Sequence, residues 1–144
     1  MTEVEFHTGV VDPIGFACRL LRKAYRKGAR VTVTAPTPVL GLLDRELWTF
    51  EQLEFVPHLR FPGVSPAAQT ERTPIWLVEG EPPAGAPEVL VNLGAASPAD
   101  VSVFRRVIEI VSAQSEDEQA GRQRWRSYKA LGLLITHHRA ADRV

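Results

Sequence analysis

Three short apolar runs constrain the fold of this chain more than any other feature of the sequence. Residues 30–34 (RVTVT), 75–78 (IWLV) and 89–93 (VLVNL) contain many β-branched side chains, and glycine or proline lies close to each. Runs of this length and composition are typical of strands that are covered on both faces, as in a parallel sheet. Parallel neighbours need a crossover connection that is usually a helix, so we expect helices between these strands.

Start and stop signals predict the first two helices. Asp12 is a suitable N-cap, Pro13 suits the first helical position, and Gly28 supplies a stop, so we predict a helix over residues 13–27. Its apolar residues recur at helical spacing and form one core-facing stripe. They are Ala17, Leu20, Leu21 and Ala24. Thr37 and Pro38 repeat the start signal and predict a second helix that ends near Trp48.

The second half of the chain carries two more helix patterns. Ser97, Pro98 and Asp100 precede apolar residues at helical spacing, which predicts a third helix over residues 97–111. The residues of that stripe are Val101, Phe104, Val107, Ile108 and Val111. Ser115 followed by Glu118 forms a capping-box pattern for a fourth helix over residues 116–131, which Gly132 closes. Residues 4–7 and 55–58 are short extended candidates, and residues 60–73 are expected to form a loop.

Strands that alternate with helices predict an α/β fold. The chain has 144 residues, a length that suits one domain, so we expect residues 1–144 to form a single unit. The expected architecture is a three-layer, open, mostly parallel sheet flanked by helices, with Rossmann-like topology. A dinucleotide site is not expected, because the first strand-to-helix turn reads TGVVDP instead of G-x-G-x-x-G, and the chain lacks a P-loop motif.

The residues that most often carry chemistry show no catalytic or metal-binding pattern. The four histidines, His7, His58, His137 and His138, lack acidic or cysteine companions at ligand spacing. Cys18 has no histidine at hand to activate it and is interpreted as a small buried hydrophobe. The carboxylates single out no general acid and base. We therefore expect no catalytic residue, no metal and no cofactor.

The expected location is the cytoplasm. The N-terminus has no basic stretch followed by an apolar one, and a lone cysteine cannot form an intramolecular disulfide. No apolar run approaches the roughly 20 residues that a membrane span requires.

Charge is segregated along the chain, although 17 basic residues balance 17 acidic ones overall. From Gly121 to the C-terminus there are six basic residues and only one acidic residue, Asp142. On a helix, Arg122, Trp125, Arg126 and Lys129 share one arc of the surface, because their spacings are three and four. An aromatic ring inside a cationic stripe suits an acidic peptide with an apolar end, or nucleic-acid phosphates with base stacking. A solvated helix face with Trp125 packed inward is the alternative.

Two motifs resemble a known family. L-W-x(6)-F-V-P-H spans residues 47–58, and R-x-R-[YW]-[KR]-x-Y-[KR]-x-x-G spans residues 122–132. With the intervening strands and the Pro/Gly linker, the chain resembles the chi subunit of bacterial DNA polymerase III holoenzyme over nearly its whole length. The resemblance implies a non-catalytic accessory protein of the clamp-loader assembly that links the replicase to single-stranded DNA-binding protein, with nucleic acid contacted only indirectly.

The resemblance also implies which residues bind partners. In the family the acidic C-terminal tail of single-stranded DNA-binding protein, with an apolar Asp-Ile-Pro-Phe type end, docks on the surface of the second motif. Carried over by position, that site comprises Arg122, Trp125 and Arg126, with Val111 and Trp48 lining it, and Lys129 extends its stripe. A psi subunit is bound through another face, where Phe55 matches the aromatic residue.

Two positions depart from the family pattern. Glu118 stands where relatives have a lysine, and Trp125 replaces a usual tyrosine. The alternatives to a tail-binding subunit are a direct single-stranded nucleic-acid binder that uses the basic C-terminal helix and a small nucleotide-binding α/β enzyme.

Overall fold

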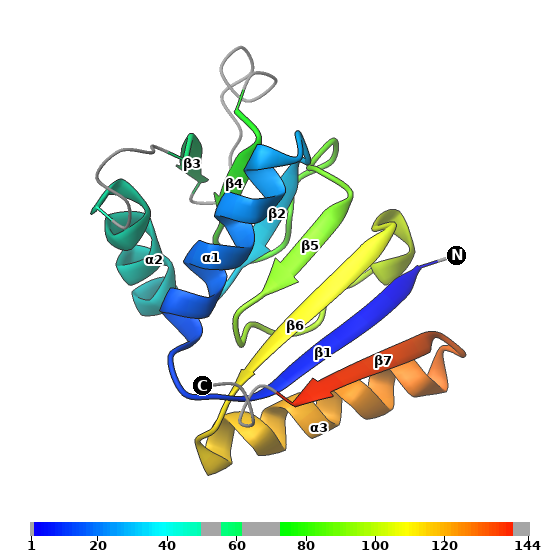
Figure 1. Ribbon diagram of the computed structural model, residues 1–144. Helices are drawn as coiled ribbons and strands as arrows, with labels where there is room; N and C mark the ends of the chain where they lie inside the picture. Colours follow the sequence, from blue (N-terminus) through cyan, green and yellow to red (C-terminus); the bar gives the residue numbers. More distant parts are fainter. Residues whose placement is uncertain (1, 50–55, 62–72, 140–144) are drawn as a thin grey trace.

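A computed structural model describes residues 2–49, 56–61 and 73–139, and its centre is an all-parallel sheet. The seven strands have the order β3-β4-β2-β5-β6-β1-β7 (Figure 1). Their bounds are Glu3–Val10 (β1), Val31–Thr34 (β2), His58–Phe61 (β3), Ile75–Val78 (β4), Val89–Asn92 (β5), Arg106–Ser112 (β6) and Leu134–Arg139 (β7). The predicted open, parallel α/β sheet is therefore confirmed.

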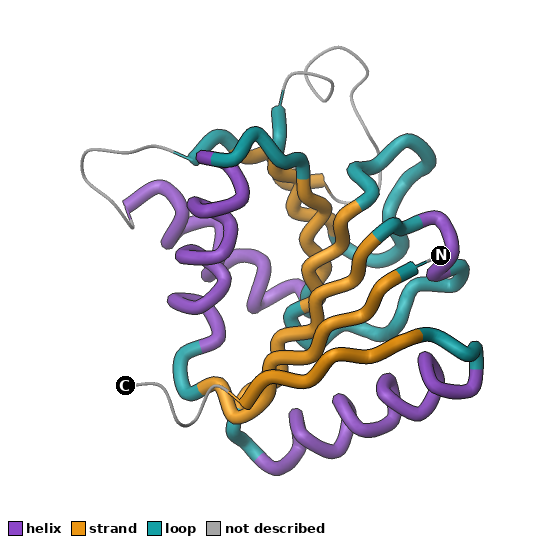
Figure 2. Tube along the Cα trace, turned by 45° about the vertical axis from the view of Figure 1, so that its right-hand side comes forward, coloured by secondary structure: helices purple, strands orange, loops and turns teal. Residues whose placement is uncertain are grey.

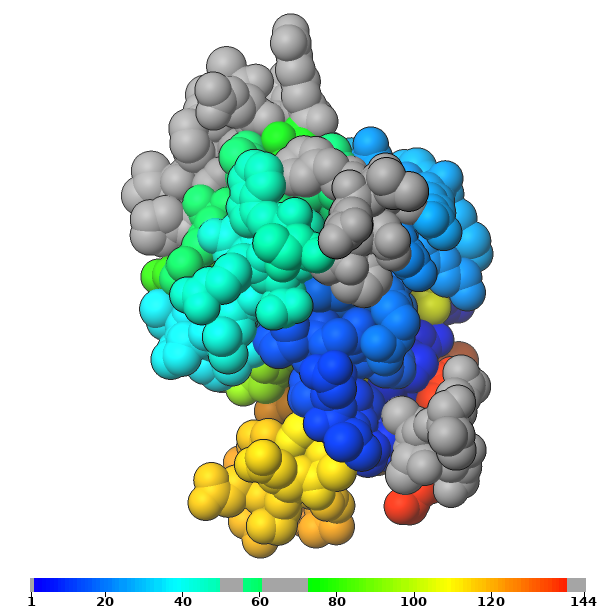
Figure 3. All heavy atoms as spheres, turned by 60° about the vertical axis from the view of Figure 1, so that its left-hand side comes forward, coloured from blue at the N-terminus to red at the C-terminus, as the bar shows by residue number. Residues whose placement is uncertain are grey.

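Three helices cover the two faces of this sheet. Helices α1 (Pro13–Arg26) and α2 (Thr37–Thr49) lie on one face, whereas α3 (Ser115–Ala130) lies on the other, below β1 and β7 (Figures 1 and 2). Figure 3 shows α1 and α2 packed side by side, with α3 at the lower end of the molecule. No helix in the described part of the chain is both long and apolar enough to cross a membrane.

The first two helices form as their sequence signals predict. The Asp12 side chain accepts a hydrogen bond from the Gly15 amide at 3.0 Å, and Pro13 occupies the first turn of α1. Gly28 follows the helix with a φ of 75°, a left-handed conformation that glycine adopts without strain. Helix α2 begins at Thr37 and includes Trp48, as expected.

The predicted third helix is wrong. Residues Val101–Val103 form one short 3₁₀ turn, capped by Asp100, and Arg106–Ser112 form strand β6 between β5 and β1. The apolar residues of this segment fit helical spacing, but Val107, Ile108, Ile110 and Val111 equally fit a strand that is buried on both faces. Its central place in the sheet decides the outcome, because β6 pairs with a parallel neighbour on each side.

Two smaller predictions also need correction. The extended segment predicted at residues 55–58 is the edge strand β3, which begins at His58 and includes Arg60 and Phe61. Those two residues were expected in the loop that follows; residues 62–72 of that loop lie outside the described residues. Helix α3 has the predicted extent within a residue, but Ser115 does not cap it, since the N-cap residue is Gln114 and makes no side-chain hydrogen bond.

The core lies in two main layers. Between the sheet and helices α1 and α2, buried side chains such as Leu21, Leu40 and Val33 form the larger cluster. Between the sheet and α3, a second cluster contains Val4, Phe6 and Tyr128. Val4 and Phe6 of β1 both belong to this second cluster, so their side chains lie on the α3 side of the sheet.

Candidate functional site

A pocket of about 380 Å³ lies between α3 and the strands that it covers. Its walls come from β1 and from three elements that follow one another late in the chain: the end of β6, α3 and β7. The lining residues are Phe6, Thr8, Val111, Glu118, Gly121, Arg122, Trp125, Arg126, His137 and Arg139. We refer to this cavity as the α3 pocket.

The floor of the α3 pocket is apolar and aromatic. Phe6 and Val111 are buried, and the Trp125 ring lies 4.9 Å from the Phe6 ring at an angle of 53°. The His137 ring meets Trp125 edge-on at 5.4 Å, and its Nε2 is hydrogen-bonded to the Thr8 hydroxyl at 2.7 Å. Tilted and edge-on ring contacts of this kind are favourable and hold the indole in one place.

The rim of the pocket is cationic. Arg122 and Arg126 project from α3, and Arg139 projects from β7, and all three are exposed. One acidic residue, Glu118, lies among them, with its carboxylate 3.8 Å from the Arg122 guanidinium one helical turn away. An apolar floor with a cationic rim can accept an apolar side chain while the arginines bind carboxylates.

Helix α3 approaches the sheet closely at the pocket because residue 121 is glycine. A Cβ atom added there would lie 3.0 Å from Val111 Cγ2 and 3.1 Å from Cγ1. These separations are tighter than most side-chain contacts, so a larger residue would require Val111 or the helix to shift by a few tenths of an ångström.

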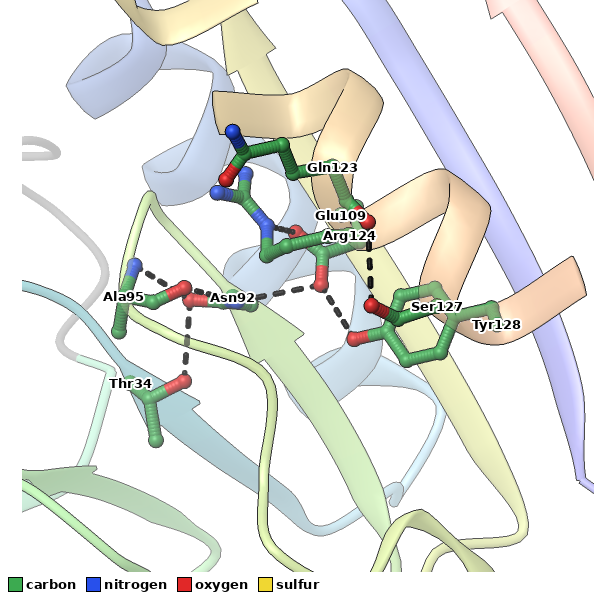
Figure 4. Close-up of polar contacts among 8 residues, drawn as sticks. All are labelled: Thr34, Asn92, Ala95, Glu109, Gln123, Arg124, Ser127 and Tyr128. Carbon is green, nitrogen blue, oxygen red and sulfur yellow. Dashed lines mark hydrogen bonds and ion pairs between the residues drawn. The ribbon is translucent and has the colours of Figure 1, made fainter. Parts of the chain in front are cut away.

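A buried polar network fixes the rotation of α3 (Figure 4). The Glu109 carboxylate on β6 is fully buried and accepts hydrogen bonds from Arg124 Nε at 2.8 Å and from the Tyr128 hydroxyl at 2.6 Å. Asn92 Nδ2 donates to the same carboxylate at 3.1 Å, and Asn92 Oδ1 accepts from Thr34 at 3.2 Å. Arg124 and Tyr128 thus point inward, which leaves Arg122 and Arg126 on the outside of the helix.

Burial is the largest influence on the pKa values of Glu109 and Tyr128 in this network. It raises the pKa of Glu109 above its usual value of 4.5, while Arg124 and the hydrogen bonds from Tyr128 and Asn92 act in the opposite direction. Burial, with the charge and hydrogen bond of Glu109, also raises the pKa of Tyr128, so its hydroxyl keeps the proton that it donates.

The structure brings together most of the residues predicted for the site, but not all of them. Arg122, Trp125, Arg126 and Val111 line the α3 pocket. Lys129 is exposed on α3 but is not a lining residue. Trp48 is placed elsewhere, near the end of α2, where it is 60% exposed and its ring meets His58 edge-on at 5.4 Å. Phe55 lies outside the described residues.

The sequence count overstated the charge at the C-terminal end of the chain. Arg124 is only 7% exposed, and its charge is paired with Glu109, so it adds nothing to the surface of the pocket. Phe6, Thr8, His137 and the role of Arg139 were not predicted. They belong to the pocket because β1 and β7 are neighbours, with Phe6 beside His137 and Thr8 beside Arg139. This pairing could be derived only from the topology.

Two predictions about reactive groups have different outcomes. Cys18 is buried as expected, and burial, with Glu46 and Asp12 nearby, raises the pKa of its thiol to about 11. The sequence shows no acidic companion of a histidine at metal-ligand spacing, but the fold places a carboxylate beside two of the histidines. Asp44 Oδ1 lies 2.9 Å from His58 Nε2, and Glu5 Oε2 lies 2.8 Å from His7 Nε2. Among the described residues, no three such side chains cluster as a metal site would require.

Known proteins match this chain along nearly its whole length. The family model described as DNA polymerase III chi subunit, HolC, matches residues 1–136. A protein named DNA polymerase III subunit chi, from Pseudomonas aeruginosa strain PAO1, is 35% identical over 144 residues, which cover 96% of this chain and 97% of the relative. The fold, the two motifs and these matches agree, and we conclude that the chain belongs to the DNA polymerase III chi subunit family.

Proposed function

We propose that this chain is a non-catalytic accessory subunit of the DNA polymerase III clamp-loader assembly that works in replication in the cytoplasm. Its part is to hold the acidic C-terminal tail of single-stranded DNA-binding protein in the α3 pocket. The observation that carries this proposal is the composition of the pocket, where an aromatic floor lies inside a rim of three exposed arginines. Family membership supports the role in the polymerase.

The pocket suits a peptide with an apolar end and acidic residues before it. The apolar end packs on Phe6, Val111 and Trp125, and the upstream carboxylates reach Arg122, Arg126 or Arg139. A charge-assisted hydrogen bond contributes about 1.5 to 3 kcal/mol, so each arginine that binds a carboxylate strengthens the complex about ten-fold to a hundred-fold. A tail that becomes ordered on binding loses entropy, which keeps the single-site affinity in the micromolar range.

The experiment is a titration of a fluorescently labelled acidic peptide that ends in Asp-Ile-Pro-Phe, followed by anisotropy. We expect saturable binding that Arg122→Glu weakens at least about ten-fold, because the variant replaces a cation of the rim with an anion. Arg45→Glu on α2 is the matched control, since Arg45 is also exposed and the charge change is the same. If Arg122→Glu binds as tightly as the wild-type protein, the pocket does not hold the tail.

A variant at Glu118 should have the opposite effect on peptide binding. Its carboxylate lies in the pocket and interacts with Arg122 at 3.8 Å, so it competes with the carboxylates of the peptide. We expect Glu118→Gln to strengthen peptide binding a few-fold, within the range of exposed ion pairs of about 0.2 to 1 kcal/mol. A weaker complex would contradict this expectation, because it would show that Glu118 assists binding instead of competing with the peptide.

We also propose a second partner, a psi-like subunit, to which the family resemblance assigns Phe55, and we propose that Trp48 contributes to the same interaction. Trp48 lies apart from the α3 pocket and is a large exposed apolar side chain, which supports its assignment to this second surface. A purified psi-like subunit should bind the wild-type protein in calorimetry and lose affinity for Trp48→Ala. The same variant should bind the acidic peptide normally, and loss of peptide binding instead would return Trp48 to the tail site.

A further inference from the structure

A second cationic surface lies on the opposite side of the sheet from the α3 pocket. Helix α1 and its C-cap carry five basic residues and no acidic one. Lys23 and Lys27 are exposed and four residues apart, which places them on one line along the helix at a spacing of about 6 Å. A row of cations on one helix face is the kind of electrostatic footprint that phosphates bind.

These lysines border a groove of about 660 Å³ between α1 and the sheet. Figures 1 and 2 show that, among the described residues, no helix crosses the faces of β1 and β7 on this side. Two exposed arginines, Arg105 just before β6 and Arg106 at its start, also line the groove. We refer to this cavity as the α1 groove.

The floor of the α1 groove holds stacked imidazole rings. His7 on β1 and His138 on β7 lie with their centroids 4.9 Å apart and their planes 17° apart. Phe16 on α1 meets the His7 ring at 5.1 Å on a tilt of 53°. The His138 side chain is 39% exposed, so an aromatic ligand can reach this stack from the solvent.

The acidic residues of the groove cancel only part of its positive charge. Burial alone raises the pKa of Glu5, but hydrogen bonds from His7 and Arg106 outweigh that effect and lower the pKa. The Glu5 carboxylate therefore stays ionised, paired with Arg106 at 3.0 Å and His7 at 2.8 Å. Glu3 is the other acidic lining residue, against Lys23, Lys27 and Arg105.

We propose that the α1 groove binds single-stranded DNA, with phosphates on Lys23, Lys27 and Arg105 and a base stacked on His138. A cationic groove with aromatic rings on its floor is the common design of sites that bind single strands without sequence preference. Only an unpaired base can reach the rings, so a duplex gains the charge contacts alone. The groove and the α3 pocket lie on opposite faces of the sheet, so this binding goes beyond the proposed tail binding and does not depend on it.

The test measures the anisotropy of a labelled oligothymidylate at low and at physiological salt. Lys23→Glu/Lys27→Glu should weaken binding at least about ten-fold. The slope of the logarithm of the binding constant against the logarithm of the salt concentration should become shallower by about 1.4, because each phosphate contact contributes about 0.7 to this slope. His138→Ala should weaken binding about five-fold or more without changing that slope, since stacking is not ionic. Both variants should bind the acidic peptide like the wild-type protein, which separates this site from the tail site.

Two controls keep the result decisive. Arg45→Glu/Lys129→Glu carries the same change in net charge on exposed positions outside the groove and should keep oligonucleotide affinity within about two-fold. If Lys23→Glu/Lys27→Glu lowers the thermal unfolding midpoint, Lys23→Gln/Lys27→Gln is used in its place, because it removes the two charges without reversing them. The proposal is overturned if the wild-type protein does not bind the oligonucleotide at low salt. It is equally overturned if the control pair weakens binding as much as the groove pair, or if duplex binds as tightly as single strand.

Discussion

Helices α1 and α3 cover opposite faces of one sheet, but different interactions hold them there. The buried residues of α1 are Ala17, Cys18 and Leu21, a continuous apolar stripe. The buried residues of α3 are Gly121, Arg124 and Tyr128, so its contact with the sheet depends on a close approach at glycine and on hydrogen bonds to Glu109.

The difference teaches how a polar helix can present a binding surface. An apolar stripe is non-directional and defines a face of the helix only broadly. Hydrogen bonds to one buried carboxylate are directional, and a buried polar group left without a partner is costly. These bonds therefore specify one rotation of the helix. In α3 that rotation places Trp125 on Phe6 and leaves Arg122 and Arg126 at the rim of the α3 pocket.

The largest expected effect comes from removing the carboxylate that anchors α3. Glu109→Leu leaves the Arg124 charge buried without its partner, which should destabilise the protein by about 3 to 5 kcal/mol in urea unfolding. Glu109→Leu/Arg124→Leu removes both charges and should recover most of that loss, since apolar replacement of a whole buried pair is often neutral. A single variant as stable as the wild-type protein would show that the network does not anchor the helix.

The pH dependence of stability should also separate the two helices. Because burial raises the pKa of Glu109, the folded state keeps its proton to higher pH than the unfolded state does. The contribution of this group is complete below the unfolded pKa, near 4.5, and is lost as pH rises through the folded value. The stability difference between wild type and Glu109→Gln should therefore shrink as pH rises.

A control on the other face of the sheet isolates this effect. Leu21→Ala on α1 removes only apolar contacts, and its cost of about 2 to 5 kcal/mol should be the same at every pH. If the wild type and Glu109→Gln show parallel pH profiles, Glu109 does not titrate differently in the folded state.

Gly121 tests the close approach of α3 to β6. Alanine favours a helix by about 1 kcal/mol over glycine, but its Cβ meets Val111 at 3.0 Å, and overpacking costs about 1 to 3 kcal/mol. Gly121→Ala should therefore be neutral or destabilising by up to about 2 kcal/mol in thermal unfolding, and it should weaken peptide binding as α3 shifts. Clear stabilisation with unchanged peptide affinity would show that the approach has no role.

The smallest expected effect compares the two helix N-termini. Asp12 accepts a hydrogen bond from the Gly15 amide, so Asp12→Ala should destabilise the protein by about 1 kcal/mol. Gln114 makes no side-chain cap at α3, so Gln114→Ala should change stability by less than about 0.5 kcal/mol. Equal losses at the two positions would remove this distinction between the helices.

The sequence predicts the elements that have local signals, but not the features that depend on contacts between distant residues. Helices α1 and α2, the parallel sheet and the extent of α3 have local signals: caps, prolines, glycines and apolar runs. Strand β6 was mistaken for a helix because a short apolar run fits both periods, and only pairing with β5 and β1 decides between them. Glu109 and Arg124 are 15 residues apart, and no local pattern indicates that they form a buried pair.

The pocket was predictable on one wall only. The spacing of Arg122, Trp125 and Arg126 on a helix is a local pattern, and it identified the α3 side. The opposite wall comes from β1 and β7, which are more than a hundred residues apart and meet only through the register of the sheet. Motif resemblance placed Trp48 at the pocket, and the structure places it on α2 instead.

Chemical-shift mapping by NMR tests the central claim most directly. Adding the acidic peptide to isotopically labelled protein should move the resonances of Gly121, Arg122, the Trp125 indole, His137 and Arg139, while those of Lys23 and Lys27 on α1 stay in place. This result would show that the pocket set by the Glu109 network holds the tail. Shifts confined to α1 or to the region around Trp48, with none at Arg122 and Trp125, would contradict the account.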